Sequence, residues 1–347
     1  MMRVPFQFTV RRLRRGEEVV HAPRGRLRDD CYLGTKVHVL NVYERCGHAC
    51  AYCYSEWPWS PREVVVRTNL VGRVRRDLAK RYVGRRVVLN LGSATDPYQP
   101  VEKKFRFMRR IIPLLKEFNA SFYICTKSSL ILRDLDLLKG YEACWVAVSL
   151  ASLDEEFAEV FEPGAARPRD RLRVVERLLD EGIFTVVRIS PILPFISDGE
   201  MLDELVRELK ALNVRYVTAD ILKLDRRGYI LSRSVGEGRP SWKRSLAESL
   251  RAWQERRKLK IDLEKAYLQM FYREGENLHG WMVPQKGYRL KVLGRLRELC
   301  HPEIKFSVCA MGVDLRNALT TWIGDDHTYR CSCLAREPTI ISPPGRD

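Results

Sequence analysis

The chain has 347 residues, of which 45% are hydrophobic and 30% charged, a composition typical of a globular protein rather than a disordered one. It has no apolar run long enough for a transmembrane helix and no apolar segment of a signal peptide near its start, so we expect a cytoplasmic protein with no membrane partner. Sixty-one basic against 44 acidic residues give a net charge of +17. This excess favours a polyanionic partner such as nucleic acid, although an arginine-rich surface adapted to heat is an alternative explanation.

Short apolar segments alternate with amphipathic, charge-rich segments through the first two thirds of the chain. Strands are predicted at 37–43, 87–91, 121–125, 145–150, 184–189 and 216–222, and helices at 68–81, 103–118, 130–139, 169–181 and 198–212. Asp198 is expected to cap the last of these helices. Such alternation predicts parallel βαβ units. Six units can form an open doubly wound sheet or a full or partial β/α barrel, whose active site lies where the strands end.

The two ends of the chain differ in character from this central part. Residues 1–36 form a basic extension, 37–225 the α/β core, and 226–347 a C-terminal extension that begins with a linker containing Gly228, Gly236, Gly238 and Pro240. In the last part we predict helices at 241–258, 262–272 and 289–299 and a strand at 304–308.

Three cysteines, Cys46, Cys50 and Cys53, lie in one loop directly after the first predicted strand. Thiolates at this spacing can hold three irons of a 4Fe–4S cluster and leave the fourth iron open to a small molecule. Zinc is the main rival, because His48 lies between the cysteines. Structural zinc sites usually pair two cysteine knuckles, however, and no second knuckle lies close in sequence. The pattern therefore favours an iron–sulfur cluster.

The region 37–225 resembles the radical S-adenosylmethionine (radical SAM) enzymes, and in particular the family that includes spore photoproduct lyase. The cysteine loop resembles their signature, and the segment Thr95-Asp96-Pro97-Tyr98-Gln99-Pro100 resembles a motif after the second strand of that family. Further similar segments are 126–128, 133–134, 149–150, 162–163, 171 and 190–192. The resemblance implies a partial (β/α)6 barrel of the TIM type. It also implies a cluster that cleaves S-adenosylmethionine to a 5′-deoxyadenosyl radical, fed by an electron donor such as ferredoxin or flavodoxin.

The same resemblance implies roles for several polar residues after the strands. Lys127 and Ser149 are expected to meet the methionine carboxylate, and Ser93, Thr95 and Asp96 the amino group. Pro191 and Ile192 are expected to pack on the adenine, with the backbone near 220–221 at its edge. Tyr52 and Tyr54 stand where the resembling lyase has tyrosines implicated in passing a hydrogen atom. By residue type alone these side chains have simpler explanations, namely a cap, a turn, a solvated lysine or aromatic packing.

In one respect the chain departs from spore photoproduct lyase. That family places a hydrogen-donating cysteine just after the second strand, whereas residues 93–96 here contain none. We therefore expect a lyase-like relative with a different substrate.

A second group of cysteines lies near the C-terminus: Cys300, Cys309, Cys331 and Cys333. Four thiolates can bind an auxiliary iron–sulfur cluster or zinc, and their irregular spacing leaves buried thiols as the alternative. Cys309 ends a predicted strand, so it is also a candidate hydrogen donor to substrate.

Arginines in the N-terminal extension, together with Trp57, Trp59 and Arg62, suit phosphate contact and base stacking. The sequence thus predicts a radical SAM enzyme that acts on nucleic acid or a nucleotide-like substrate. A radical SAM enzyme that modifies peptides or proteins, with an auxiliary cluster, is one alternative. A zinc-containing nucleic-acid-binding protein is the other.

Overall fold

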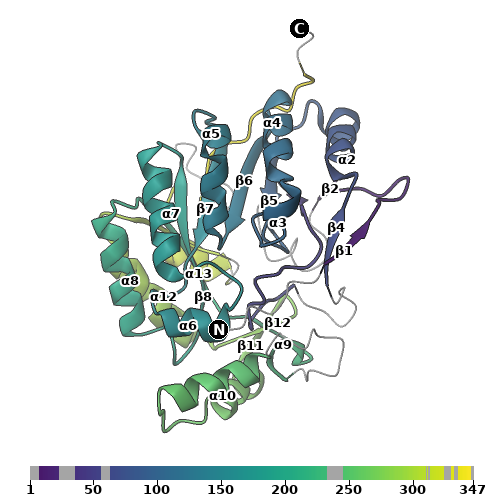
Figure 1. The fold of residues 1–347 in the computed structure, drawn as a ribbon. Helices are drawn as coiled ribbons and strands as arrows, with labels where there is room; N and C mark the ends of the chain where they lie inside the picture. Colours follow the sequence, from purple (N-terminus) through teal and green to yellow (C-terminus); the bar gives the residue numbers. More distant parts are fainter. Residues whose placement is uncertain are drawn as a thin grey trace.

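The computed structural model describes residues 8–22, 36–55, 63–232, 245–309, 311, 313–323, 330–331 and 335–344. An eight-stranded sheet with the order β13-β9-β8-β7-β6-β5-β3-β2 dominates this part of the chain (Figure 1). Its parallel strands are β3 (Val37–Leu40), β5 (Val88–Leu91), β6 (Ser121–Thr126), β7 (Cys144–Ser149), β8 (Thr185–Ile192), β9 (Tyr216–Ile221) and β13 (Lys305–Val308). The short strand β2 (Val20–His21) is antiparallel to β3 at one edge. The predicted partial β/α barrel is confirmed, and each of its predicted strands is present within a few residues.

Helices cover the outer face of the sheet (Figure 1). They are α2 (Leu70–Asp77), continued by η1 (Leu78–Tyr82), then α3 (Glu102–Phe105), α4 (Met108–Glu117), η2 (Ser129–Asp134), α5 (Leu135–Leu138), α6 (Glu155–Phe161), α7 (Pro168–Asp180) and α8 (Glu200–Ala211). The predicted cap of α8 is wrong. Gly199 precedes the helix and no side chain caps it, because the Asp198 carboxylate instead accepts a hydrogen bond from the Tyr288 hydroxyl.

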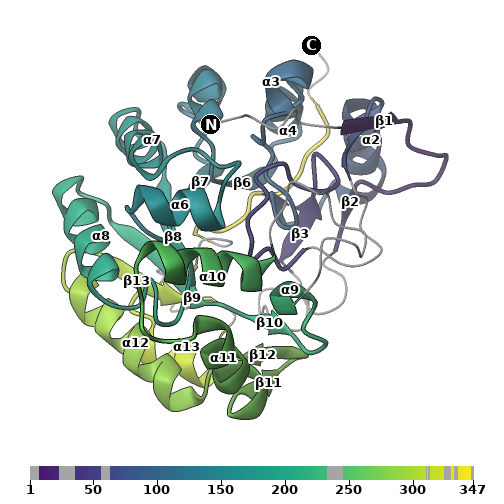
Figure 2. The same cartoon turned by 60° about the horizontal axis from the view of Figure 1, so that its bottom comes forward.

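The C-terminal part of the chain contributes to the same sheet and also forms a small layer of its own. It contains β10 (Leu224–Asp225), α9 (Tyr229–Ser232), α10 (Leu246–Arg256), α11 (Leu263–Tyr267), η3 (Leu268–Arg273), β11 (Glu276–Leu278), β12 (Trp281–Val283), α12 (Lys286–Cys300) and α13 (Val313–Leu319). Strand β13 pairs with β9, so the main sheet crosses the predicted boundary at residue 225. Figure 1 shows α9, α10, β11 and β12 below the strands of the main sheet, and Figure 2 brings them, with the sheet β10-β12-β11, to the front.

Three strands near the N-terminus were not predicted: β2, at the edge of the main sheet, and the two strands of a separate small sheet. β1 (Phe8–Arg11) pairs in parallel with β4 (Val64–Arg67) in a separate two-stranded sheet, and Glu44 bridges to Val65. The apolar run of β4 is only three residues long, which is too short to show a period. This small sheet matters because it holds the start of the cysteine loop beside β4.

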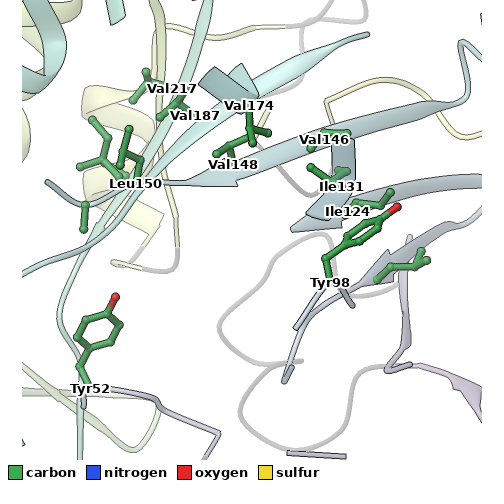
Figure 3. Close-up of a cluster of buried hydrophobic side chains, with 14 of the residues drawn as sticks. Tyr52, Tyr98, Ile124, Ile131, Val146, Val148, Leu150, Val174, Val187 and Val217 are labelled. Carbon is green, nitrogen blue, oxygen red and sulfur yellow. The ribbon is translucent and has the colours of Figure 1, made fainter. Parts of the chain in front are cut away.

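The apolar core has two parts, because successive strand residues face opposite sides. The larger part lies between the sheet and the helices, where Val148, Leu150, Val174 and Val187 come together (Figure 3). The smaller part lies inside the barrel near the amino ends of the strands. Its members are Val37, Val88, Tyr123, Trp145, Ala147, Val186, Trp322, Cys331 and Ala335. The last three come from the C-terminal segment, which therefore closes this end of the barrel. No helix in the described ranges is long and apolar enough to cross a membrane.

Candidate functional site

The loop after β3 carries the three half-buried cysteines and is held at its start by one buried side chain. Gln99 accepts a hydrogen bond from the Gly47 amide at 2.8 Å and donates one to the Arg45 carbonyl at 3.0 Å. Gln99 is completely buried, so these bonds have no water competing for them. The loop after β5 thus fixes the backbone on both sides of Cys46.

A second anchor joins the middle of the cysteine loop to the segment after α6. His48 makes 2.9 Å hydrogen bonds through Nδ1 to the Gly164 carbonyl and through Nε2 to the Asp96 carboxylate, and its own carbonyl accepts from the Gly164 amide. A Cβ on Gly164 would lie 2.3 Å from the Gly47 carbonyl oxygen. Only glycine allows the two backbones to approach this closely.

Asp96 is the buried centre of this arrangement. Its carboxylate accepts hydrogen bonds from His48, from the Thr126 hydroxyl at 2.8 Å, and from the amides of Tyr98 and Lys127 at 2.8 and 2.7 Å. Burial raises the pKa of Asp96, but His48 and the backbone donors outweigh it and lower the pKa below its ordinary value. Four donors use the acceptor capacity of a carboxylate. The geometry therefore shows that Asp96 positions the loop, and its expected role at the amino group stays a prediction.

The other two residues expected at the amino group lie beside Asp96. The Thr95 side chain is buried, and its hydroxyl is 3.4 Å from the Tyr43 carbonyl. Ser93 is half-buried, and its carbonyl accepts a hydrogen bond from the Tyr54 hydroxyl. The Tyr54 ring also packs edge-on against Trp281 of β12, with 6.2 Å between ring centroids.

Lys127 and Ser149, at the carboxyl ends of β6 and β7, are in contact. The Lys127 ammonium donates to the Ser149 hydroxyl at 2.6 Å and lies 3.9 Å from the Glu162 carboxylate. Glu162 also accepts hydrogen bonds from the Tyr52 hydroxyl and from Arg171. The sequence-predicted residues Lys127, Ser149 and Tyr52 are thus brought into one network.

Burial and neighbouring charges keep Glu162 ionised and Tyr52 protonated in this network. Burial raises the pKa of Glu162, but Arg171 and Lys127 outweigh it, so the pKa is lowered and the carboxylate stays ionised. Burial and the Glu162 charge raise the pKa of Tyr52 well above its ordinary value, so its hydroxyl keeps its proton. Sequence reasoning noted Glu162 and Arg171 only as parts of the resemblance and did not foresee this pairing.

A third polar group stands at the carboxyl ends of β8, β9 and β13. The Arg188 guanidinium lies 3.2 Å from the Asp220 carboxylate and 3.7 Å from the Cys309 sulfur. Cys309 thus lies at the barrel mouth, and Arg188 was missed by sequence reasoning. A usable signal existed, because Phe184, Val186 and Arg188 alternate on one face of the predicted strand. Pro191 is half-buried, whereas Ile192 is completely buried in the core between sheet and helices.

The C-terminal cysteines do not come together in the described residues. Cys300 ends α12 in the outer core, where burial raises the pKa of its thiol to about 12, and Cys331 lies in the inner core at the other end of the barrel. Cys333 lies outside the described residues, as do Arg62, Trp57 and Trp59. The predicted second metal centre therefore gains no support from the part of the chain that the structure describes.

The donor set at the cysteine loop fits a cluster better than a single ion. Among the described residues, no three His, Cys, Asp or Glu side chains converge as ligands of one metal ion, which a tetrahedral zinc site requires. Both ring nitrogens of His48 are already hydrogen-bonded, which removes the one nearby nitrogen ligand. Three separate thiols on one anchored loop fit a 4Fe–4S cluster, in which the cysteines bind a multi-iron core rather than one ion.

Comparisons with known proteins point in the same direction. Residues 40–204 match the model of the Radical SAM superfamily. An uncharacterised protein of Mycobacterium tuberculosis (strain ATCC 25618 / H37Rv) is 34% identical over 197 residues, 52% of this chain and 57% of that protein. The chain thus spans little more than half the length of this relative.

Two further similar proteins carry descriptive names. A Radical SAM Nalpha-GlyT isomerase of Pseudomonas phage M6 is 24% identical over 188 residues, 53% of this chain and 38% of the phage protein. Among solved structures, a spore photoproduct lyase variant with bound AdoMet and dinucleoside spore photoproduct superimposes with a TM-score of 0.53. That match covers 78% of this chain and 75% of the lyase at 15% identity, and shows a shared fold.

Proposed function

We propose that the chain is a radical SAM enzyme acting on nucleic acid or a nucleotide-like substrate, because residues 40–204 match the model of the Radical SAM superfamily. The observation that carries the proposal is the anchored cysteine loop above the carboxyl ends of parallel strands, with Lys127 and Ser149 beside it. When bound, a 4Fe–4S cluster supplies the electron that cleaves S-adenosylmethionine and produces the radical that attacks substrate. We further propose a small electron-transfer protein, of the ferredoxin or flavodoxin kind, as the reductant.

The chain's own residues bind and orient the cofactor in this scheme. Cys46, Cys50 and Cys53 would hold the cluster, and Gln99 with Asp96 holds their loop. We assign Lys127 to the methionine carboxylate, and the sharing of its neighbouring carboxylate, Glu162, with Arg171 supports this role. A charge-assisted hydrogen bond between ammonium and carboxylate is of the stronger kind. Ser149, which accepts from Lys127, fixes the direction of that ammonium.

Substrate is expected to enter where Arg188, Asp220 and Cys309 line the mouth. The net charge of +17 supports a polyanionic substrate, and the dinucleoside bound to the similar lyase supports a nucleotide. Because residues 93–96 lack a cysteine, Cys309 is the candidate that returns a hydrogen atom to the substrate radical. We expect Cys309→Ala to leave S-adenosylmethionine cleavage intact while changing the product.

The proposal is tested by anaerobic reconstitution with iron and sulfide. We expect about four irons per chain and dithionite-dependent formation of 5′-deoxyadenosine, both abolished in Cys50→Ala. Incubation with deuterated DNA or RNA would then show deuterium in the 5′-deoxyadenosine. A colourless protein that binds zinc would overturn the enzyme, and deuterium transfer only from peptides would overturn the substrate.

A further inference from the structure

A cavity of about 280 Å³ lies beside the cysteine loop, at the carboxyl end of β3. Its lining includes Asn41, Arg45, Ser55, Arg67, Ala94 and Thr95. Arg45 directly precedes the first cysteine of the loop, and the Ser55 hydroxyl lies 3.1 Å from the Cys53 sulfur. Lys127, Ser149 and Arg188, to which the proposed function gives roles, do not line it. Thr95, which is expected at the amino group of S-adenosylmethionine, does line it, so the cavity adjoins the proposed cofactor site.

Arg67, at the end of β4, brings an incompletely partnered cation to this cavity. Its side chain is only 8% exposed. One nitrogen donates to the Asn41 carbonyl, another lies 4.0 Å from the Glu44 carboxylate, and Nε has no hydrogen-bond partner among the described residues. A buried guanidinium with donors left over is costly unless an acceptor arrives. Burial lowers the pKa of Arg67, and Glu44 only partly opposes this effect.

The carboxylates of the lining supply that acceptor only in part, because each is also bound to another arginine. Glu44 accepts a hydrogen bond from Arg11, which also pairs with Glu17. Glu18 lies 3.0 Å from Arg81. Neither Arg11 nor Arg81 lines the cavity, whereas Arg45 does and is itself 9% exposed. The lining therefore contains two buried arginines and two glutamates, and each glutamate also pairs with an arginine outside the lining.

We propose that this cavity binds a phosphate group of the nucleic-acid substrate, an inference that rests on the proposed function. A phosphate presents several acceptor oxygens, and a guanidinium matches them in geometry and charge. The volume suits one such group with part of its nucleotide rather than a whole oligonucleotide. A phosphate held by Arg67 would keep the adjoining nucleoside beside the cysteine loop.

The test compares two probes on the anaerobically reconstituted protein. One is a mixed-sequence DNA hexamer, and the other is the same hexamer with uncharged methylphosphonate linkages. We expect the wild type to bind the charged hexamer at least about tenfold more tightly, and Arg67→Gln to lose about tenfold in affinity for it and little for the uncharged probe. The slope of log affinity against log salt should fall by about 0.7 in Arg67→Gln. Inorganic phosphate should compete with the charged hexamer in the wild type.

Matched variants separate this cavity from general surface charge. Arg177→Gln removes an exposed arginine on α7, paired with Glu181, and should leave the salt slope unchanged. Arg67→Lys keeps a charge and should recover part of the affinity, which a merely structural role would not predict. Iron content and thermal unfolding show whether Arg67→Gln remains folded. If Arg67→Gln unfolds, two measurements on the wild type test the site. These are the difference in affinity between the two hexamers and the competition of inorganic phosphate with the charged hexamer.

The outcomes distinguish the two levels of the proposal. If the wild type binds neither hexamer at low salt, the nucleic-acid substrate itself is wrong. If the wild type binds DNA but Arg67→Gln keeps both the preference for the charged probe and the salt slope, the phosphate site is wrong and the proposed function stands.

Discussion

The two ends of the barrel are built from the same strands but carry opposite chemistry. On the inward face of β7 the residues run Trp145, Ala147, Ser149, and on β9 they run Tyr216, Thr218, Asp220. At the amino ends the rings of Phe184 and Tyr216 pack against Trp322, with 4.6 Å between the Tyr216 and Trp322 centroids. At the carboxyl ends hydroxyl and carboxylate groups meet Lys127 and Arg188. The apolar core at one end of the barrel and the polar groups at the other end are therefore only a few residues apart on each strand.

This difference shows how one chain can tolerate buried charge at its functional end. The closed end excludes water with largely apolar side chains, so it contributes apolar burial. At the mouth, charges such as Glu162 are held by Arg171 and Tyr52, and Asp96 by four donors. A substitution should therefore affect mainly stability at one end and mainly cofactor binding at the other.

The largest expected effect comes from the mouth, with Gly164→Ala. The new Cβ would lie 2.3 Å from the Gly47 carbonyl, so the cysteine loop must move. We expect the iron content to fall well below four per chain and S-adenosylmethionine cleavage to drop by about 100-fold or more. Gly199→Ala is the matched control, because a Cβ there meets nothing within 4 Å. Equal iron content in the two variants would contradict the proposed role of the close approach.

The next effect belongs to the closed end, with Trp322→Ala. Trp322 is 3% exposed and packs on Phe184 and Tyr216. Its removal should lower the free energy of unfolding by about 3–5 kcal/mol, measured by urea denaturation. The folded fraction should keep its affinity for S-adenosylmethionine. Ile323→Ala, at an exposed neighbouring position, should cost little. If Trp322→Ala lost its affinity for S-adenosylmethionine while its free energy of unfolding stayed unchanged, this difference between the two ends would be wrong.

A smaller effect is expected for Lys127→Met at the mouth. Loss of one charge-assisted hydrogen bond to the methionine carboxylate should raise the KM for S-adenosylmethionine by about 10–100-fold, with a smaller change in kcat. Lys139→Met, on an exposed lysine paired with Glu181, is the control. A fall in kcat alone would assign Lys127 to the reaction rather than to binding.

The fold was predictable because its strands are short apolar runs between amphipathic helices, and strand 304–308 was found even in the C-terminal part. The site was predictable only where residue identity is distinctive. Three cysteines in one loop indicate a cluster, and Lys127 after a strand indicates a cation at the mouth. The contacts of a side chain depend on segments that are distant in sequence. The hydrogen bond between Asp96 and His48 could therefore not be predicted from the residues next to Asp96 in the chain. For the same reason Cys331 reaches the inner core because the C-terminal segment folds back under the strands.

The smallest expected effect concerns His38 on β3, whose side chain contacts η1 rather than the barrel mouth. Burial, together with nearby cations such as Arg85, lowers the pKa of His38 from 6.5 to about 4, and its Nδ1 is 2.8 Å from the Tyr82 hydroxyl. Between these values the unfolded chain binds a proton that the folded chain does not, so stability decreases as pH falls from 6.5 to 4. After allowance for solvent screening, the loss should be about 1–2 kcal/mol. His38→Gln should flatten this part of the urea-denaturation profile without changing cluster content, because the His38 ring bonds to the buried Tyr82 of η1. A profile that stays equally steep in the variant would place the titrating group elsewhere, and the carboxylates at the mouth would then be the first to examine.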